Sequence, residues 1–283
     1  MQRYKIIHRT YYNFSGPITL GLHTLRLRPR EDHELRIEAF DLKIEPAADV
    51  LWHRDVEDNS IAIASFAKPT QQLAIESEVI IQQYLENPLD FLVADYAVDY
   101  PFSYQQDDLV LLSPYMAVAG GEIAAELRRW IGSVWRQGEA IQTYSLLQRL
   151  TTSIYQGMSY QVREEPGVQA ATHTLAQGSG SCRDFAQLLM AAARQLGFAA
   201  RFVTGYLHAP LSPAAGATHA WAEIYLPGAG WKGFDPTTGS IAGADHIPVA
   251  VSRLAESVPP VEGSFRGAAR AQLDVGVWVS KCA

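Results

Sequence analysis

The sequence predicts an α+β protein in which an N-terminal antiparallel β-sandwich precedes a domain of helices and strands. About the first 88 residues alternate apolar and polar side chains with the period of two that strands require, and no long helical pattern interrupts them. From Gly120 onward the apolar residues recur at steps of three and four, as in helices, and strand patterns return near residue 200. We therefore expect a sandwich over residues 1–105 and a second domain over residues 106–283.

The strands of the sandwich are expected where this alternation is clearest. Asp58 and Asn59 lie between two such stretches and are typical of a hairpin turn. Residues 87–101 are less regular and are expected to connect the two domains. The predicted strands are residues 1–9, 35–44, 51–56, 61–66 and 73–84.

In the second domain, helices are expected before strands. The predicted helices cover residues 122–135 and 143–155, and a third begins at Cys182. A strand is expected near residues 200–207, followed by a hairpin over residues 218–235. Two further strands are predicted over residues 246–254 and 273–279.

The composition is that of a globular protein and disfavours several classes of function. Of the 283 residues, 48% are hydrophobic and 19% are charged, and the formal net charge is −7. An acidic chain without a concentrated basic face is not expected to bind nucleic acid. No apolar run reaches the roughly 18 residues of a membrane helix, so we expect no membrane association. The N-terminal strand pattern lacks a signal-peptide core, and the chain has only two cysteines, Cys182 and Cys282, so we expect reduced thiols and a cytoplasmic location.

The surroundings of Cys182 predict a thiol at the beginning of a helix. Gly178 and Gly180 give the preceding loop unusual backbone freedom, Ser181 is a candidate N-cap, and Gly197 stands where a left-handed C-cap belongs. The first turn of a helix carries unpaired N–H groups and the positive end of the helix dipole, which favour a thiolate over a thiol. The alternative is a small buried hydrophobic residue, as most free cysteines are. The apolar face of this helix comprises Phe185, Leu188, Leu189, Ala192 and Leu196.

The hairpin that follows carries a histidine near its start and an aspartate near its end. If Leu226 paired with Trp231 across a four-residue loop, His219 and Asp235 would point to opposite faces of the sheet. A five-residue loop or a one-residue bulge would instead pair Tyr225 with Trp231 and make Asp235 the diagonal neighbour of His219. We predict this irregularity, because without it the two side chains would not meet.

The order Cys182, His219, Asp235 predicts an acyl-transfer site. A helix-borne thiolate attacks a carbonyl carbon, an imidazole carries the proton, and a carboxylate fixes the tautomer of the ring. Taken singly, the histidine is also consistent with a structural strand residue and the aspartate with a turn residue. The sequence has no cysteine pair, no His-Glu-x-x-His and no phosphate loop, so we expect neither a metal nor a cofactor.

Three separated motifs occur in the order and type of a known family, and two flanking segments agree with it. These segments resemble the bacterial transglutaminase-like proteins, which are papain-like thiol enzymes. The resemblance implies a papain-like or transglutaminase-like α+β core with Cys182 as nucleophile, His219 as general base and acid, and Asp235 as orienter. Residues 254–256 depart from the family pattern. The motifs are residues 178–207, 219–223 and 234–239, and the flanking segments are Tyr4 to Arg30 and Val258 to Gly267.

Three other residues are candidates for the substrate pocket or for binding the oxyanion beside the backbone N–H of Cys182. By analogy with papain-like sites Gln177 could donate the second hydrogen bond, although the sequence favours the alternative of a solvated loop glutamine. Tyr206 lies on the adjoining strand, and Trp221 shares the strand face of His219. Both are also consistent with plain core aromatics.

Two enzymatic functions and one non-catalytic function fit this pattern. The first is a cysteine peptidase or amidase that hydrolyses a peptide, amide or isopeptide bond through a thioester. The second is a protein-glutamine gamma-glutamyltransferase, in which a primary amine replaces water. The third is a non-catalytic binding module, which the three filled triad positions disfavour. We expect the partner to be a peptide or protein amide, and the sequence leaves the oligomeric state open.

Overall fold

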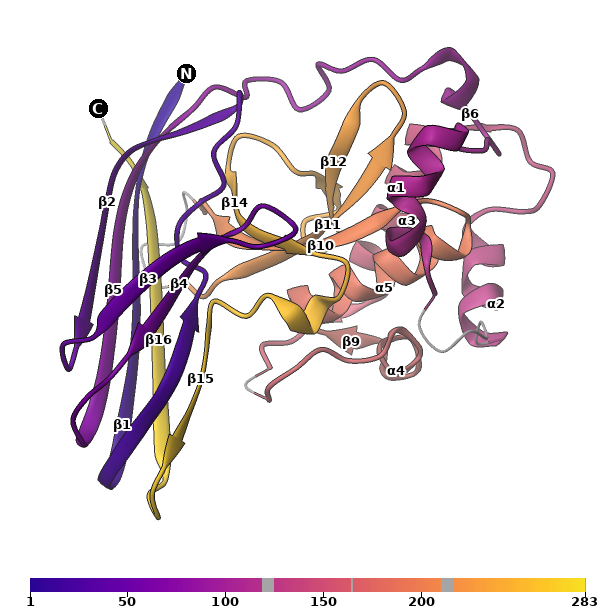
Figure 1. Cartoon of the computed structure of the whole chain (residues 1–283). Coiled ribbons are helices and arrows are strands. Elements are labelled where there is room, and N and C mark those ends of the chain that lie inside the picture. Colours follow the sequence, from indigo (N-terminus) through magenta and orange to yellow (C-terminus); the bar gives the residue numbers. More distant parts are fainter. Residues whose placement is uncertain (119–124, 164, 210–215, 283) are drawn as a thin grey trace.

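The computed structural model describes residues 1–118, 125–163, 165–209 and 216–282. Figure 1 shows an antiparallel sheet region on one side and a mixed helix-and-strand region on the other. The strands of the first region that lie early in the chain are β1 (Gln2–Leu25), β2 (Leu35–Glu45), β3 (Asp49–Arg54), β4 (Ser60–Ser65) and β5 (Thr70–Gln83). These strands confirm the predicted N-terminal antiparallel sheet, including the turn at Asp58, which has a φ of 62°.

Strand β1 is long and pairs with different strands in its first and second parts. Residues 4–14 pair with β5 and with β16 (Ala271–Lys281), whereas residues 19–25 pair with β4 and with β15 (Val261–Arg266). The register with β5 breaks between Asn13 and Ile18, where Pro17 lacks a backbone N–H. Both parts of β1 contribute to one apolar core, together with β4 and β5. Its buried residues are Phe14, Ile18, Leu20, Leu25, Leu27, Ala62, Leu73 and Ile75.

The C-terminal strands refine the predicted division of the chain. We assigned residues 106–283 to the second domain, but β15 and β16 both pair with β1 and therefore lie in the N-terminal sheet region. The strand predicted at 273–279 is β16, whereas β15 was not predicted. The division after residue 105 itself stays a prediction.

The second region contains helices on a five-stranded sheet with the order β13-β12-β11-β10-β14. Helix α5 packs against β10 and β11, and its apolar face forms one core with the facing side of the sheet. This core includes Phe185, Leu188, Leu189 and Ala222. The strands of the sheet are β10 (Ala200–Leu207), β11 (His219–Leu226), β12 (Gly230–Asp235), β13 (Ser240–Ile241) and β14 (His246–Ser252).

The helices confirm part of the prediction. Helix α3 (Thr143–Gly157) and helix α5 (Cys182–Gln195) lie where expected, and Gly197 has the predicted left-handed conformation with a φ of 87°. Helix α2 (Ala125–Val134) covers most of the predicted 122–135, of which residues 122–124 lie outside the described residues.

Several short elements were not predicted. Helix α1 (Gln106–Met116) contains Pro114, and its apolar residues do not form one buried stripe, since most of them are exposed. The sequence therefore carries no helical pattern at this position. The others span only two to seven residues. They are α4 (Ala171–Gln177), the 3₁₀ turns η1 (Asp95–Ala97) and η2 (Ala255–Ser257), strand β13, and the paired strands β6 (Asp99–Tyr100) with β7 (Ile141–Gln142) and β8 (Ser159–Tyr160) with β9 (Ser179–Gly180).

The two regions share an apolar interface. Tyr4 and Ile6 of β1 pack with Tyr206 of β10 and with Ile247 and Val249 of β14. The N-terminal region therefore packs directly against β10 and β14 of the five-stranded sheet. Among the described residues, every helix is too short or too polar to cross a membrane.

Candidate active site

The backbone around Cys182 forms a capped helix start. Helix α5 begins at Cys182, and the preceding Ser181 donates its backbone N–H and its hydroxyl to Asp184 Oδ2, both at 2.8 Å. Gly178 has a φ of 62°, and a Cβ on Gly180 would lie 2.9 Å from the Cβ of Asp184. The glycines therefore permit both the turn and the close approach that place Cys182 in the first turn of the helix.

Asp184 also fixes the loop that faces the helix start. This side chain is fully buried, and its Oδ1 accepts a hydrogen bond from the backbone N–H of Gln169 at 2.8 Å. Arg163 lies 3.4 Å from the same oxygen, and Arg183 donates to the carbonyl oxygen of Arg163 at 3.1 Å. Arg183 and Asp184, which directly follow Cys182, therefore hold Arg163 and Gln169 close to the start of the helix.

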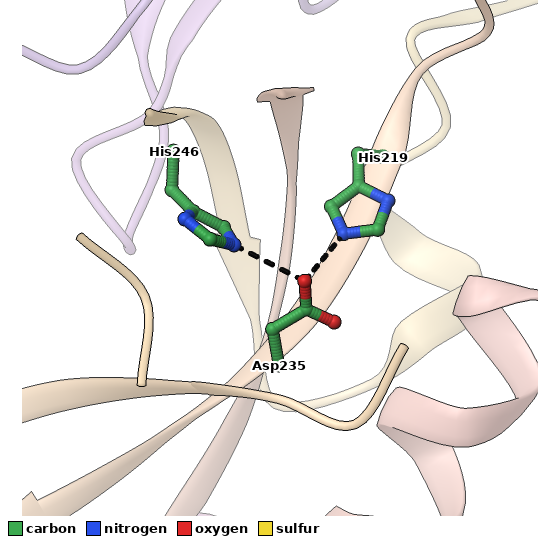
Figure 2. Close-up of side chains that lie close together, drawn as sticks. All are labelled: His219, Asp235 and His246. Atoms are coloured by element: carbon green, nitrogen blue, oxygen red, sulfur yellow. Dashed lines mark hydrogen bonds and ion pairs between the residues drawn. The ribbon is translucent and has the colours of Figure 1, made fainter. Parts of the chain in front are cut away.

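The hairpin has the register that brings its histidine and aspartate together. Tyr225 pairs with Trp231, as predicted, and Leu226 pairs with Gly230. The connection is shorter than expected, since Gly230 adopts a left-handed φ of 77° and still pairs. Figure 2 shows the result: His219 Nε2 lies 2.9 Å from Asp235 Oδ2.

The pair is buried and strongly polarised. Asp235 is fully buried, and its Oδ1 accepts the backbone N–H of Thr237 at 2.8 Å. Burial raises the pKa of Asp235, but its hydrogen bonds with His219 and His246 outweigh burial and hold the pKa well below its usual range. Burial lowers the pKa of His219, but its hydrogen bonds with Asp235 and Cys182 outweigh burial and raise the pKa to about 10. The site therefore favours an imidazolium between a carboxylate and the sulfur.

Two family descriptions match the chain in succession. The "Bacterial transglutaminase-like N-terminal region" matches residues 4–82, and the "Transglutaminase-like superfamily" matches residues 136–236. This chain belongs to the transglutaminase-like superfamily. The resemblance predicted from the motifs is thereby confirmed.

Similar proteins extend over the length of this transglutaminase-like chain. The uncharacterized protein Mb2599c of Mycobacterium bovis is 28% identical over 295 residues, which cover 97% of this chain and 91% of that protein. The uncharacterized protein ML0607 of Mycobacterium leprae is 24% identical over 289 residues and covers both chains in full. The crystal structure of a candidate cysteine protease from Cytophaga hutchinsonii has a TM-score of 0.76 at 18% identity, covering 100% of this chain and 91% of that one. The likeness confirms the predicted α+β fold with a transglutaminase-like core.

Tyr160 lies beside the thiol of the transglutaminase-like domain and was missed by sequence reasoning. Its strand β8 pairs in parallel with β9, which places Tyr160 opposite Gly180, two residues before Cys182. Burial raises the pKa of the half-exposed Tyr160 hydroxyl, and the interaction with Cys182 raises it further. The ring packs edge-on against Phe185 at 6.3 Å between centroids. A two-residue strand has no detectable periodicity, so no sequence pattern indicates this contact.

His246 was also missed as a site residue, although a strand was predicted to begin there. Its Nε2 lies 3.1 Å from Asp235 Oδ2, the same oxygen that binds His219. In the sheet, β10 lies between β11 and β14. His246 reaches the site because its strand β14 pairs with β10. No local pattern around residue 246 indicates it.

The remaining predicted residues have different surroundings. Trp221 is buried beside the site, with its ring centroid 6.1 Å from that of His219 and 5.2 Å from that of His246. Tyr206 is buried in the interface with the N-terminal region, where its hydroxyl contacts His8 Nδ1 at 3.1 Å. Gln177 is exposed at the end of α4. Trp221 is therefore the one of these three that contacts the histidines of the site.

The ligand atoms of His219, Asp235 and His246 all lie within 4.8 Å of one another, as in many metal sites. The second ring nitrogen of His246 argues against this role. An imidazole that binds a metal through Nε2 carries its proton on Nδ1. Nδ1 of His246 instead accepts the backbone N–H of Gly243 at 3.2 Å. The arrangement therefore fits hydrogen bonding to the carboxylate better than metal ligation.

Proposed function

We propose that this protein is a thiol-dependent hydrolase of the cysteine peptidase or amidase type, with Cys182, His219 and Asp235 as its triad. The observation that carries the proposal is the hydrogen bond between His219 Nε2 and Asp235 Oδ2 at 2.9 Å, on an imidazole that also interacts with Cys182. Because Nε2 is occupied by the carboxylate, Nδ1 is the nitrogen that remains for the sulfur. This is the geometry of a base held by its orienter.

The proposed reaction proceeds through a thioester. The sulfur of Cys182 attacks the carbonyl carbon, a C–S bond forms, and the π electrons move to the oxygen. The C–N bond then breaks while the His219 imidazolium gives its proton to the departing amine. Water next attacks the thioester and gives a proton to His219, the C–S bond breaks, and the acid product leaves. Asp235 holds the ring throughout and stabilises its charged form.

The oxyanion needs donors near the sulfur. The backbone N–H of Cys182 is the first candidate, because an N–H in the first turn of a helix has no acceptor within that helix. The Tyr160 hydroxyl, which interacts with the thiol, is a better second candidate than the exposed Gln177. The substrate class, a peptide or protein amide, and the cytoplasmic location stay predictions.

p-Nitrophenyl acetate tests the proposal without knowledge of the natural substrate. We expect it to transfer its acetyl group to Cys182, detected by intact mass and peptide mapping, and to release acetate as water hydrolyses the thioester. Added cadaverine measures the partition of the acetyl group between water and a primary amine. Cys182→Ala is the inactive comparison, and Cys282→Ala is the matched control that keeps the site.

The outcomes separate the alternatives. Acetate as the main product supports hydrolysis, whereas dominant N-acetylcadaverine would favour amide transfer. The proposal would be overturned if the wild type and Cys182→Ala, both folded by circular dichroism, were acetylated to the same extent. The protein would then be interpreted as a non-catalytic binding module.

A further inference from the structure

His246 lies on the same face of the sheet as His219, although β10 separates their strands. Gly205 of β10 pairs with His219 on one side and with Pro248 on the other, and His246 is two residues before Pro248. Directly paired residues share a face, and so do alternate residues along a strand. The two imidazoles therefore project from one face and reach Asp235 from opposite sides (Figure 2).

Gly205 makes room for this arrangement. A Cβ at this position would lie 2.7 Å from Cη2 of Trp221 and 2.3 Å from the carbonyl oxygen of Ile247. The indole therefore covers the glycine, and its ring meets the His246 ring edge-on, with centroids 5.2 Å apart and an interplanar angle of 81°. The buried Trp221 therefore lies over Gly205 of β10 and packs against the ring of His246.

The hydrogen bonds of His246 determine where its proton lies. The backbone N–H of Gly243 points at Nδ1 from 3.2 Å, and a backbone amide can only donate, so Nδ1 carries a lone pair. The ring proton is then on Nε2, which lies 3.1 Å from Asp235 Oδ2 and donates to it. In this geometry His246 is a neutral imidazole in one fixed tautomer.

We propose that His246 is a positioning residue of the thiol site: its neutral imidazole donates to Asp235 and thereby fixes the carboxylate that orients His219. The inference rests on the proposed thiol chemistry of Cys182. Asp235 Oδ2 receives two N–H groups, at 2.9 and 3.1 Å, while Oδ1 receives the Thr237 N–H at 2.8 Å. Three donors from three directions define the plane of a buried carboxylate.

The first test compares two substitutions at this position. The aromatic ring is kept in His246→Phe but the donor is lost, so we expect the rate of Cys182 alkylation by iodoacetamide to fall about tenfold or more, the scale of one hydrogen bond to a buried charge. The amide of His246→Gln can donate to Asp235 and accept from Gly243, so we expect it to recover most of the rate. The matched control is His208→Phe, because His208 is another buried histidine that contacts an aspartate, Asp245, at 2.9 Å.

The second test reads the proton directly and needs no variant except for assignment. In full-length protein labelled with ¹⁵N-histidine, we expect His246 at pH 7 to show a protonated Nε2 and an unprotonated Nδ1. A protonated Nδ1, or a doubly protonated ring, would overturn the proposal even if His246→Phe did not fold. So would a His246→Phe protein that is folded and alkylated at the wild-type rate.

These outcomes are distinct from a failure of the thiol proposal itself. If Cys182 in the wild-type protein reacts no faster than Cys282, the proposed function fails. If wild-type Cys182 reacts fast and His219→Ala slows it, whereas His246→Phe does not, only the role of His246 fails.

Discussion

Replacing Asp235 with asparagine is expected to slow acetylation of Cys182 by p-nitrophenyl acetate by about 10²- to 10⁴-fold, the range of a lost general base. The asparagine side chain keeps the shape of the aspartate, but its amide N–H₂ can donate to His219 Nε2. The imidazole would then carry its proton on Nδ1, the nitrogen that the proposed mechanism assigns to the sulfur, and would be unable to accept the thiol proton. The measurement is the pre-steady-state release of p-nitrophenolate at pH 7.

Asp245→Asn is the matched control for this substitution. Asp245 accepts hydrogen bonds from Tyr4 at 2.8 Å and contacts His208 at 2.9 Å, so it is a second aspartate–histidine pair in the same region of the chain. We expect its acetylation rate to stay within about twofold of the wild-type rate. An Asp235→Asn protein that is folded and acetylated as fast as the control would contradict the proposed role of Asp235.

The second large effect concerns stability against pH. The pKa of His219 is raised from 6.5 to about 10 in the folded protein, so between these values the folded state holds a proton that the unfolded chain has lost. The free energy of unfolding must therefore fall as pH rises through this window, and the contribution of His219 is fully present only below about pH 6.5. A shift of this size corresponds to at most about 5 kcal/mol.

Urea unfolding of the wild type and of His219→Gln between pH 6 and pH 9.5 measures this contribution. We expect the difference between the two free energies to be largest at pH 6 and to shrink toward pH 9.5. The upper limit keeps the scan below the range where buried tyrosines contribute, since burial raises the pKa of Tyr104 and Tyr206 in the folded state. Parallel curves for the two proteins would show that His219 is not held in its charged form.

The arrangement of His219 and Asp235 could be predicted because it follows from counting residues in one hairpin. The side-chain period of a strand is two, so a shift of one residue decides whether the two side chains share a face. The start of α5 could also be predicted, because glycines, a serine cap and an apolar stripe lie together in the sequence around Cys182. In both cases the information is local, within one element or between two adjacent ones.

His246 and Tyr160 could not be found in this way. Each reaches the site through a pairing with a strand that is distant in the sequence, β14 with β10 and β8 with β9. The return of β15 and β16 to β1 is a further long-range pairing. Strand propensity indicates that a segment is extended, but the choice among partners depends on tertiary packing.

Alkylation of Cys182 by iodoacetamide at pH 6.5, with Cys282 as an internal control, measures whether His219 holds the thiol as a thiolate. Thiolates react and thiols do not, so a cysteine paired with an imidazolium reacts at a pH where an ordinary thiol is mostly protonated. We predict that Cys182 is alkylated at least about tenfold faster than Cys282 in the wild type, and that His219→Ala abolishes this difference. Equal rates at the two cysteines in folded wild-type protein, or a Cys182 rate unchanged by His219→Ala, would contradict the account.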